Sequence, residues 1–211
     1  MQTLSKVCSE RVHAIYDQYI NVISPFIVQL EVLDGEFPVK ILNEIRAVFT
    51  HLSKYHLNND EKSNDEKSIE RQLVKAEGHI TRAILDCYKY LCMAYNDKYK
   101  EFQDAFKSVD LSAVDNGEFS MHLSKRYSDA TKKLTKAKEM ELSNYNVDSL
   151  YEAFEEAYNA YAGVYNLIDD SIKNLEWVKL RTVERDKKET LRFVIGVAVG
   201  IVATILVAIA L

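Results

Sequence analysis

The spacing of apolar residues along the chain predicts five long amphipathic helices. Apolar positions recur every three or four residues over about 4–32, 38–56, 69–107 and 119–142, and again from Val147 onwards. Pro25 removes a backbone donor and should kink the first helix. Asp34-Gly35 and Asn116-Gly117 separate neighbouring helices. The pattern predicts an all-α bundle of four to five long helices.

The fifth predicted helix carries the seam of a coiled coil or a bundle. Its apolar positions alternate four and three residues apart, at Leu150, Phe154, Ala157, Tyr161, Val164 and Ile168. This seam leaves open a SNARE-like or scaffold role. No Pro or Gly follows Gly163 before the C-terminal segment, so this helix is expected to continue into that segment.

A duplicated polar pentapeptide separates the second and third helices. Asn-Asp-Glu-Lys-Ser occupies 59–63 and again 64–68, without an apolar residue to bury. The duplication predicts a solvated loop over about 58–68.

The C-terminal segment 193–211 predicts a transmembrane helix. It contains no charged residue and would span about 28 Å as a helix, close to the hydrocarbon thickness of a bilayer. The preceding segment 179–192 is basic, which predicts a tail-anchored protein whose 1–178 domain is cytoplasmic. In this interpretation the lipid bilayer is a partner, and Arg185, Lys187, Lys188 and Arg192 face lipid headgroups.

Small residues recur every four positions within that segment. They are Gly196, Gly200, Thr204 and Ala208, and they would form one stripe along a helix. Such a stripe lets two helices approach closely, so it favours a homo-oligomer packed through these residues.

The net charge limits the partners of the chain. The whole chain carries −5, and 179–192 contributes +3, which leaves −8 for the remainder. A generally acidic domain is a poor partner for phosphate backbones. The three cysteines lie in predicted helices without zinc spacing, which predicts reduced, buried thiols. No metal site and no cofactor is predicted.

One local motif suggests chemistry. Arg46-Ala-Val-Phe-Thr-His51 has the Arg-x4-His spacing, and residues 1–110 resemble the HEPN-type helical domains of prokaryotic conflict systems. The resemblance implies metal-independent cleavage of RNA, with Arg46 and His51 as catalytic residues. It also implies a role in bacterial defence or stress.

Helical geometry favours a different grouping of the same polar residues. At 100° per residue Arg46 and His51 lie about 140° apart, whereas Glu44 and His51 share one face. His79, Arg82 and Asp86 share a face of the third helix. If the two faces meet, a carboxylate could orient a histidine and Arg82 could hold an anion. Interhelical salt bridges of a bundle are the alternative interpretation.

Three functions follow as hypotheses. In the first, a non-enzymatic bundle binds an unknown protein partner or a signal and self-associates. In the second, the chain is a membrane-tethered HEPN-like ribonuclease, and RNA is then its partner. The SNARE-like or scaffold role is the third.

Overall fold

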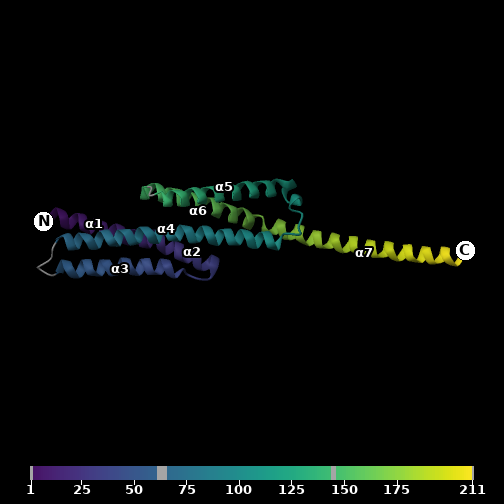
Figure 1. Ribbon diagram of the computed structural model, residues 1–211, viewed down its shortest axis with the longest axis horizontal. Coiled ribbons are helices and arrows are strands. Elements are labelled where there is room, and N and C mark those ends of the chain that lie inside the picture. Colours follow the sequence, from purple (N-terminus) through teal and green to yellow (C-terminus); the bar gives the residue numbers. More distant parts are fainter. Residues whose placement is uncertain (1, 61–65, 144–145, 211) are drawn as a thin grey trace.

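Helices make up almost all of the described chain. The computed structural model describes the backbone of residues 2–60, 66–143 and 146–210, and the side chains of 7–57, 67–143 and 146–197. The α-helices are α1 (Gln2–Gln18), α2 (Ser24–Asp34), α3 (Val39–Asp60), α4 (Glu66–Ala105), α5 (Glu118–Leu142), α6 (Val147–Asp170) and α7 (Ile172–Ala210) (Figure 1). The described backbone contains no strand, so the all-α bundle of the prediction is confirmed.

The first predicted helix is interrupted by one π-helical turn. This turn, η1, covers Tyr19–Ile23, and Pro25 follows it in the first turn of α2. A proline is tolerated there because the first N–H groups of a helix have no intrahelical partner. Gly35 ends α2 with a φ of 74°, a left-handed conformation that favours glycine.

The long helix α4 connects two hydrophobic clusters. Its 40 residues extend about 60 Å at 1.5 Å per residue. The N-terminal cluster packs α1, α2 and α3 on its first half, and the C-terminal cluster packs the start of α7 and the 106–119 connection on its second half. Helices α5 and α6 contribute buried residues to both clusters. Helices α4, α5 and α6 therefore hold the two halves of the bundle together.

Polar side chains tie α1 and α2 to the rest of the bundle. Arg11 on α1 forms a bidentate pair with Glu77 on α4, at 2.6 and 2.7 Å, and also reaches Glu70. Gln29 on α2 donates a hydrogen bond to the Tyr95 hydroxyl and accepts one from Tyr158 at 3.0 Å. Gln29 thereby links α2, α4 and α6.

Backbone conformation ends the helices where the sequence predicted breaks. Between α4 and α5 the chain forms two short 3-10 turns, η2 (Leu111–Ala113) and η3 (Asp115–Gly117). Asp115, Asn116 and Gly117 all have positive φ, so the predicted break at Asn116-Gly117 is present. Helices α3 and α4 extend into the predicted 58–68 loop, and residues 61–65 of that loop lie outside the described backbone.

The fifth predicted helix is divided in two. Ser171 interrupts it, and its N–H donates to the Ile168 carbonyl at 3.1 Å. The seam of α6 is occupied within the chain, because Leu150, Phe154, Ala157 and Tyr161 are buried in the bundle. The seam is therefore not open to a SNARE-like partner helix.

The prediction of a transmembrane helix at 193–211 is wrong. In the part of the chain that the structure describes, no helix combines the length and the apolar character that crossing a membrane requires. A span needs about 20 apolar residues, but α7 is charged up to Arg192 and its described side chains end at Val197. The predicted tail anchor and the single-pass membrane location with a cytoplasmic N-terminal domain depended on that helix and are corrected with it. The side chains of 198–211 lie outside the description.

Phe154 provides a test of the shared core. It is fully buried on α6, one turn before the residues that enter the C-terminal cluster. Replacing it by Ala should lower the free energy of unfolding by about 3–5 kcal/mol, because a large cavity opens in the bundle. Urea unfolding followed by circular dichroism measures the change. Met121→Ala on the exposed side of α5 is the control, and a loss for Phe154→Ala no larger than for this control would contradict the packing.

Candidate functional site

The candidate site lies along the interface between α3 and α4. Apolar residues of both helices fill the centre of this interface, among them Ile45 and Val48 on α3 and Leu73 and Ile80 on α4. The helices are antiparallel neighbours joined by the 61–65 connection (Figure 1). Polar residues flank this apolar strip, and the antiparallel arrangement brings the first turns of α3 beside the middle of α4.

Glu44, His79 and Arg82 meet at this edge. Glu44 Oε2 lies 2.7 Å from His79 Nδ1 and 3.0 Å from Arg82 Nε. The side chains of Glu44 and His79 are 21% and 23% exposed, so this contact is only partly open to water. The two helix faces that the sequence singled out therefore do meet.

The proton of His79 belongs on Nδ1. Arg82 Nη2 lies 2.7 Å from the same nitrogen, but an arginine N–H only donates, so this contact is a hydrogen bond only if Nδ1 has no proton. The carboxylate of Glu44 favours the Nδ1–H form, since it accepts from it. In that tautomer the other ring nitrogen, Nε2, can accept a proton.

Glu44 is held in its ionised form. Burial alone would raise its pKa, but the hydrogen bonds from His79 and Arg82 outweigh burial, and the pKa of Glu44 lies below its ordinary value of 4.5. A carboxylate fixed in this way orients the histidine ring by accepting its Nδ1–H hydrogen bond. This is the arrangement used in general acid–base catalysis.

A second histidine stacks on the first. The rings of His51 and His79 lie 5.3 Å apart between centroids and are nearly parallel, at 18°. His51 Nδ1 lies 2.8 Å from Gln72 Oε1, an acceptor, so Nδ1 of His51 carries the proton in this contact. Gln72 was missed from the sequence, although it lies seven residues before His79 and therefore on the same face of α4.

Asp86 belongs to a separate cluster further along α4. Its side chain is only 6% exposed and lies 3.0 Å from Lys40 Nζ and 3.6 Å from Lys89 Nζ. Lys89 also pairs with Glu141 on α5. The cluster ties α3, α4 and α5 together, and neither lysine was singled out from the sequence. Asp86 makes no contact with His79 among the described interactions.

Arg46 stands apart from the histidines. Its side chain is exposed, and within the described part of the chain it forms no hydrogen bond or ion pair. The backbone carbonyl of Arg46 accepts a hydrogen bond from the Thr50 hydroxyl at 2.8 Å. The structure thus brings His51 to Gln72 and His79 rather than to Arg46.

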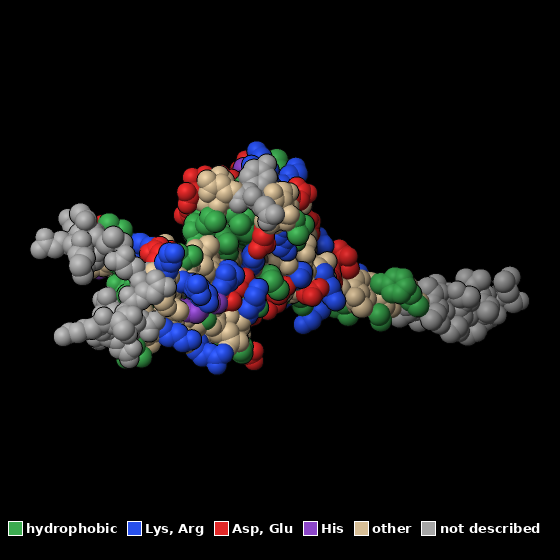
Figure 2. All heavy atoms as spheres, turned by 60° about the vertical axis from the view of Figure 1, so that its left-hand side comes forward, with side chains coloured by type: hydrophobic (Ala, Val, Ile, Leu, Met, Phe, Trp, Pro, Cys, Tyr) green, Lys and Arg blue, Asp and Glu red, His purple; other side chains and the backbone are tan. Residues whose placement is uncertain are grey.

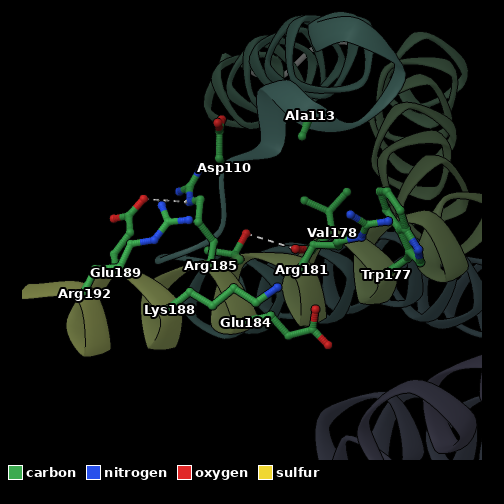
Figure 3. Close-up of a pocket in the computed structure, with 11 residues that line it drawn as sticks. Asp110, Ala113, Trp177, Val178, Arg181, Glu184, Arg185, Lys188, Glu189 and Arg192 are labelled. Atoms are coloured by element: carbon green, nitrogen blue, oxygen red, sulfur yellow. Dashed lines mark hydrogen bonds and ion pairs between the residues drawn. The ribbon is translucent and has the colours of Figure 1, made fainter. Parts of the chain in front are cut away.

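A hollow of about 380 Å³ lies where α7 leaves the bundle (Figure 3). Three of the predicted headgroup residues line it, namely Arg185, Lys188 and Arg192, and Asp110 closes it from the connection before α5. Arg185 lies 4.0 Å from Glu189, and Arg181 stacks over the Trp177 ring at 4.7 Å. Because acidic and basic side chains alternate around it, this hollow has no strong preference for an anion. Lys187 lies on another side of α7, beside Val183.

The predicted stripe of small residues falls largely outside the description. The side chains of residues 200, 204 and 208 are not described. At Gly196 a Cβ would meet nothing within 4 Å. Within one chain, that face of α7 is therefore open.

The cysteines are free thiols. Cys87 and Cys92 are buried, and burial raises the pKa of both to about 12. They stay protonated at neutral pH and are poor nucleophiles. Among the described residues no group of three or more His, Cys, Asp or Glu side chains could hold a metal ion.

Comparison of the chain with protein-family models, with curated proteins and with solved structures found no match. The resemblance of residues 1–110 to HEPN-type domains stays a prediction.

The pairing of Glu44 should make stability depend on pH. Its pKa is lower in the folded chain than in the unfolded chain, so its ionised form stabilises the fold above about pH 4.5. This contribution is lost as the pH falls through the lower, folded value. The difference in unfolding free energy between wild type and Glu44→Gln should therefore be largest near pH 7 and vanish in acid.

Urea unfolding of both proteins at pH 7, 5 and 3 measures this difference. Glu31→Gln removes an exposed carboxylate from α2 and serves as the control. A difference between wild type and Glu44→Gln that stays constant over this range would show that Glu44 gains nothing from its partners.

Proposed function

We propose that this protein is a non-enzymatic assembly protein, in which α1 to α6 form a folded head and α7 is an arm that pairs with α7 of a second copy. The observation that carries this proposal is the exposed apolar face of α7 beyond its contact with the head. Assembly of this kind fits the self-association expected from the sequence.

The arm is attached to the head only at its beginning. Leu175 and Val178 are buried in the C-terminal cluster, and Lys179 lies over the Phe106 ring at 4.9 Å. Among the described side chains of α7, Thr182 is the last that is buried, and those from 183 to 197 are exposed. Figure 1 shows the helix continuing alone along the long axis of the molecule.

The exposed part of the arm carries large apolar side chains. They include Leu180 (67% exposed), Leu191 (59%), Phe193 (72%) and Val194 (55%). Figure 2 shows apolar atoms gathered on the projecting segment where the description ends. Exposed apolar side chains gathered on one helix favour contact with another apolar surface.

The seam positions have the period of a two-stranded coiled coil. Steps of three and four residues alternate through Leu180, Val183, Lys187, Thr190, Val194 and Val197, of which Lys187 and Thr190 are polar. In heptad terms Leu180, Lys187 and Val194 take the a positions. Gly196 lies on the opposite side of the helix, so this face is distinct from the small-residue stripe.

Lys187 gives the pairing its selectivity. A single lysine at an a position lowers the stability of a coiled coil but specifies its register and the number of strands. In a parallel, in-register pair each Lys187 lies beside its counterpart, and its long side chain can carry the charge out to water. We therefore propose a parallel pair of arms.

Two aspartate substitutions distinguish the two faces of the arm. Val194→Asp places a charge in the proposed seam and should weaken self-association more than about 100-fold, since an unpaired buried charge costs about 3 kcal/mol. Gly196→Asp introduces the same side chain on the other face and should leave association unchanged. Sedimentation equilibrium of the full-length proteins measures both. The reverse result would assign pairing to the small-residue stripe.

The geometry at α3 and α4 favours a second candidate function, metal-independent cleavage of RNA. Cleavage of this kind needs one group that removes a proton and one that donates a proton. His51 and His79 lie in stacking contact, and Gln72 and Glu44 hold their Nδ1 atoms. Arg82 is half exposed beside them and can contact a phosphate.

Substitution of single residues tests this second function. His79→Ala and His51→Ala should each lower the rate of RNA cleavage by about 10²–10⁴-fold, the usual contribution of a general acid or base. Arg46→Ala should change the rate little, because its exposed side chain contacts neither histidine. Cleavage of a labelled RNA in the presence of EDTA measures the rate, with His122→Ala on α5 as control. Cleavage by all variants at the wild-type rate would remove this function.

A further inference from the structure

Two neighbouring helices of the head carry opposite charges. Helix α6 contains six acidic residues and no Lys or Arg. Helix α5 contains six Lys or Arg between Lys125 and Lys138, and of its four acidic residues only Asp129 lies within that stretch. The chain as a whole is acidic. The basic character of α5 is therefore a local departure from the rest of the molecule.

The charges on both helices face outward. On α5, the buried residues Phe119, Leu123, Ala130 and Ala137 face the core, and Lys125, Lys132 and Lys136 are exposed on the other side. On α6, the residues Glu152, Glu155 and Glu156 are exposed opposite the buried seam. We name these two sets the basic stripe (Lys125, Lys132, Lys136) and the acidic stripe (Glu152, Glu155, Glu156).

The end of the basic stripe at Lys136 lies level with the acidic stripe, whereas Lys125 lies nearer Gly163, which its neighbour Arg126 contacts. A groove of about 150 Å³ between α5 and α6 is lined by Lys136 from one stripe and by Glu152 and Glu156 from the other. Within the described residues, no member of either stripe forms an ion pair. Each helix therefore presents its charge to the outside.

We infer that a second copy of this chain docks on the α5–α6 face, with the basic stripe of each copy on the acidic stripe of the other. Closed dimers are two-fold symmetric, and the same patch is then used on both copies. A two-fold axis parallel to the helices, between α5 and α6, places α5 of one copy over α6 of its partner. An axis perpendicular to the helices would place like charges on each other. Charge thus selects the first arrangement.

This arrangement also orients the arms. A two-fold axis parallel to the helices leaves the direction along the bundle unchanged, so both α7 helices leave the dimer on the same side. Figure 1 shows α7 running along the same long axis as α5 and α6. This consequence for the arms rests on the proposed function, whereas the α5–α6 face stands on the charges alone.

Crosslinking between isotopically distinct copies tests the face on the unaltered protein. Full-length chains labelled with 14N and 15N are mixed and treated with a carbodiimide, which joins a lysine amine to a carboxylate as an amide with loss of water. Mass spectrometry should find crosslinks of Lys132 or Lys136 to Glu152, Glu155 or Glu156 that combine 14N and 15N peptides. These mixed crosslinks should decrease at least about tenfold in 0.5 M salt, because exposed charges are then screened. Crosslinks only within one isotope would overturn the inference.

Charge reversal gives an independent result. Lys132→Glu with Lys136→Glu, and Glu152→Lys with Glu155→Lys, should each lose the mixed crosslinks and weaken dimers at least tenfold, while an equimolar mixture of the two variants should regain them. Arg71→Glu with Lys75→Glu reverses exposed charges on α4 and should have no effect. Thermal unfolding confirms that each variant is folded. A mixture of folded variants that fails to associate would contradict the face.

The two interfaces can fail separately. If Val194→Asp weakens assembly and the mixed Lys–Glu crosslinks still form in this variant at high protein concentration, both interfaces are present. If Val194→Asp has no effect and the mixed crosslinks are found, the α5–α6 interface is supported and the proposed pairing of the α7 helices is contradicted.

Discussion

The continuous apolar stripe of α4 is the constraint on which the rest of the structure depends. It begins at Leu73 and continues to Phe102, and each of the other helices of the head packs on part of it or on its neighbours. A helix of this length cannot bury its apolar face against a single partner of ordinary length. Two clusters therefore share it, and α5 and α6 bridge them. The same stripe fixes the rotation of α4, and so decides that His79 and Arg82 face α3.

Helix positions followed from the sequence because burial imposes a period that single residues reveal. Helix α5 is the predicted 119–142 helix with Glu118 added at its start. The predicted 38–56 helix covers the greater part of α3. The interruption at Ser171 was not predictable, since serine carries no strong helix-breaking signal and the break is one residue long. The prediction of a membrane span at 193–211 depended on the length of the apolar run. It was wrong, because no helix in the described part of the chain is long and apolar enough to cross a membrane.

The candidate site was only partly predictable, because its contacts depend on the register between α3 and α4. Helical spacing correctly placed Glu44 with His51 and His79 with Arg82, since each pair lies on one helix. Helical spacing could not show that His51 would contact Gln72, or that Asp86 would form ion pairs with Lys40 and Lys89. The local Arg46–His51 spacing was the least informative signal. Helical twist separates the two side chains, whatever the rest of the fold does.

The proposed dimer bears directly on the two interpretations of the polar cluster. Arg46 and His51 could share a site only if a partner chain supplied one of them. Figure 1 shows α3 and α5 on opposite sides of α4, so a dimer formed through α5 and α6 leaves the two α3 helices on its outer sides. The partner's α3 is then too remote to complete the pair. In that dimer, the proposed RNA cleavage would therefore depend on His51, His79 and Arg82 of one chain, and self-association would not supply Arg46 to the site.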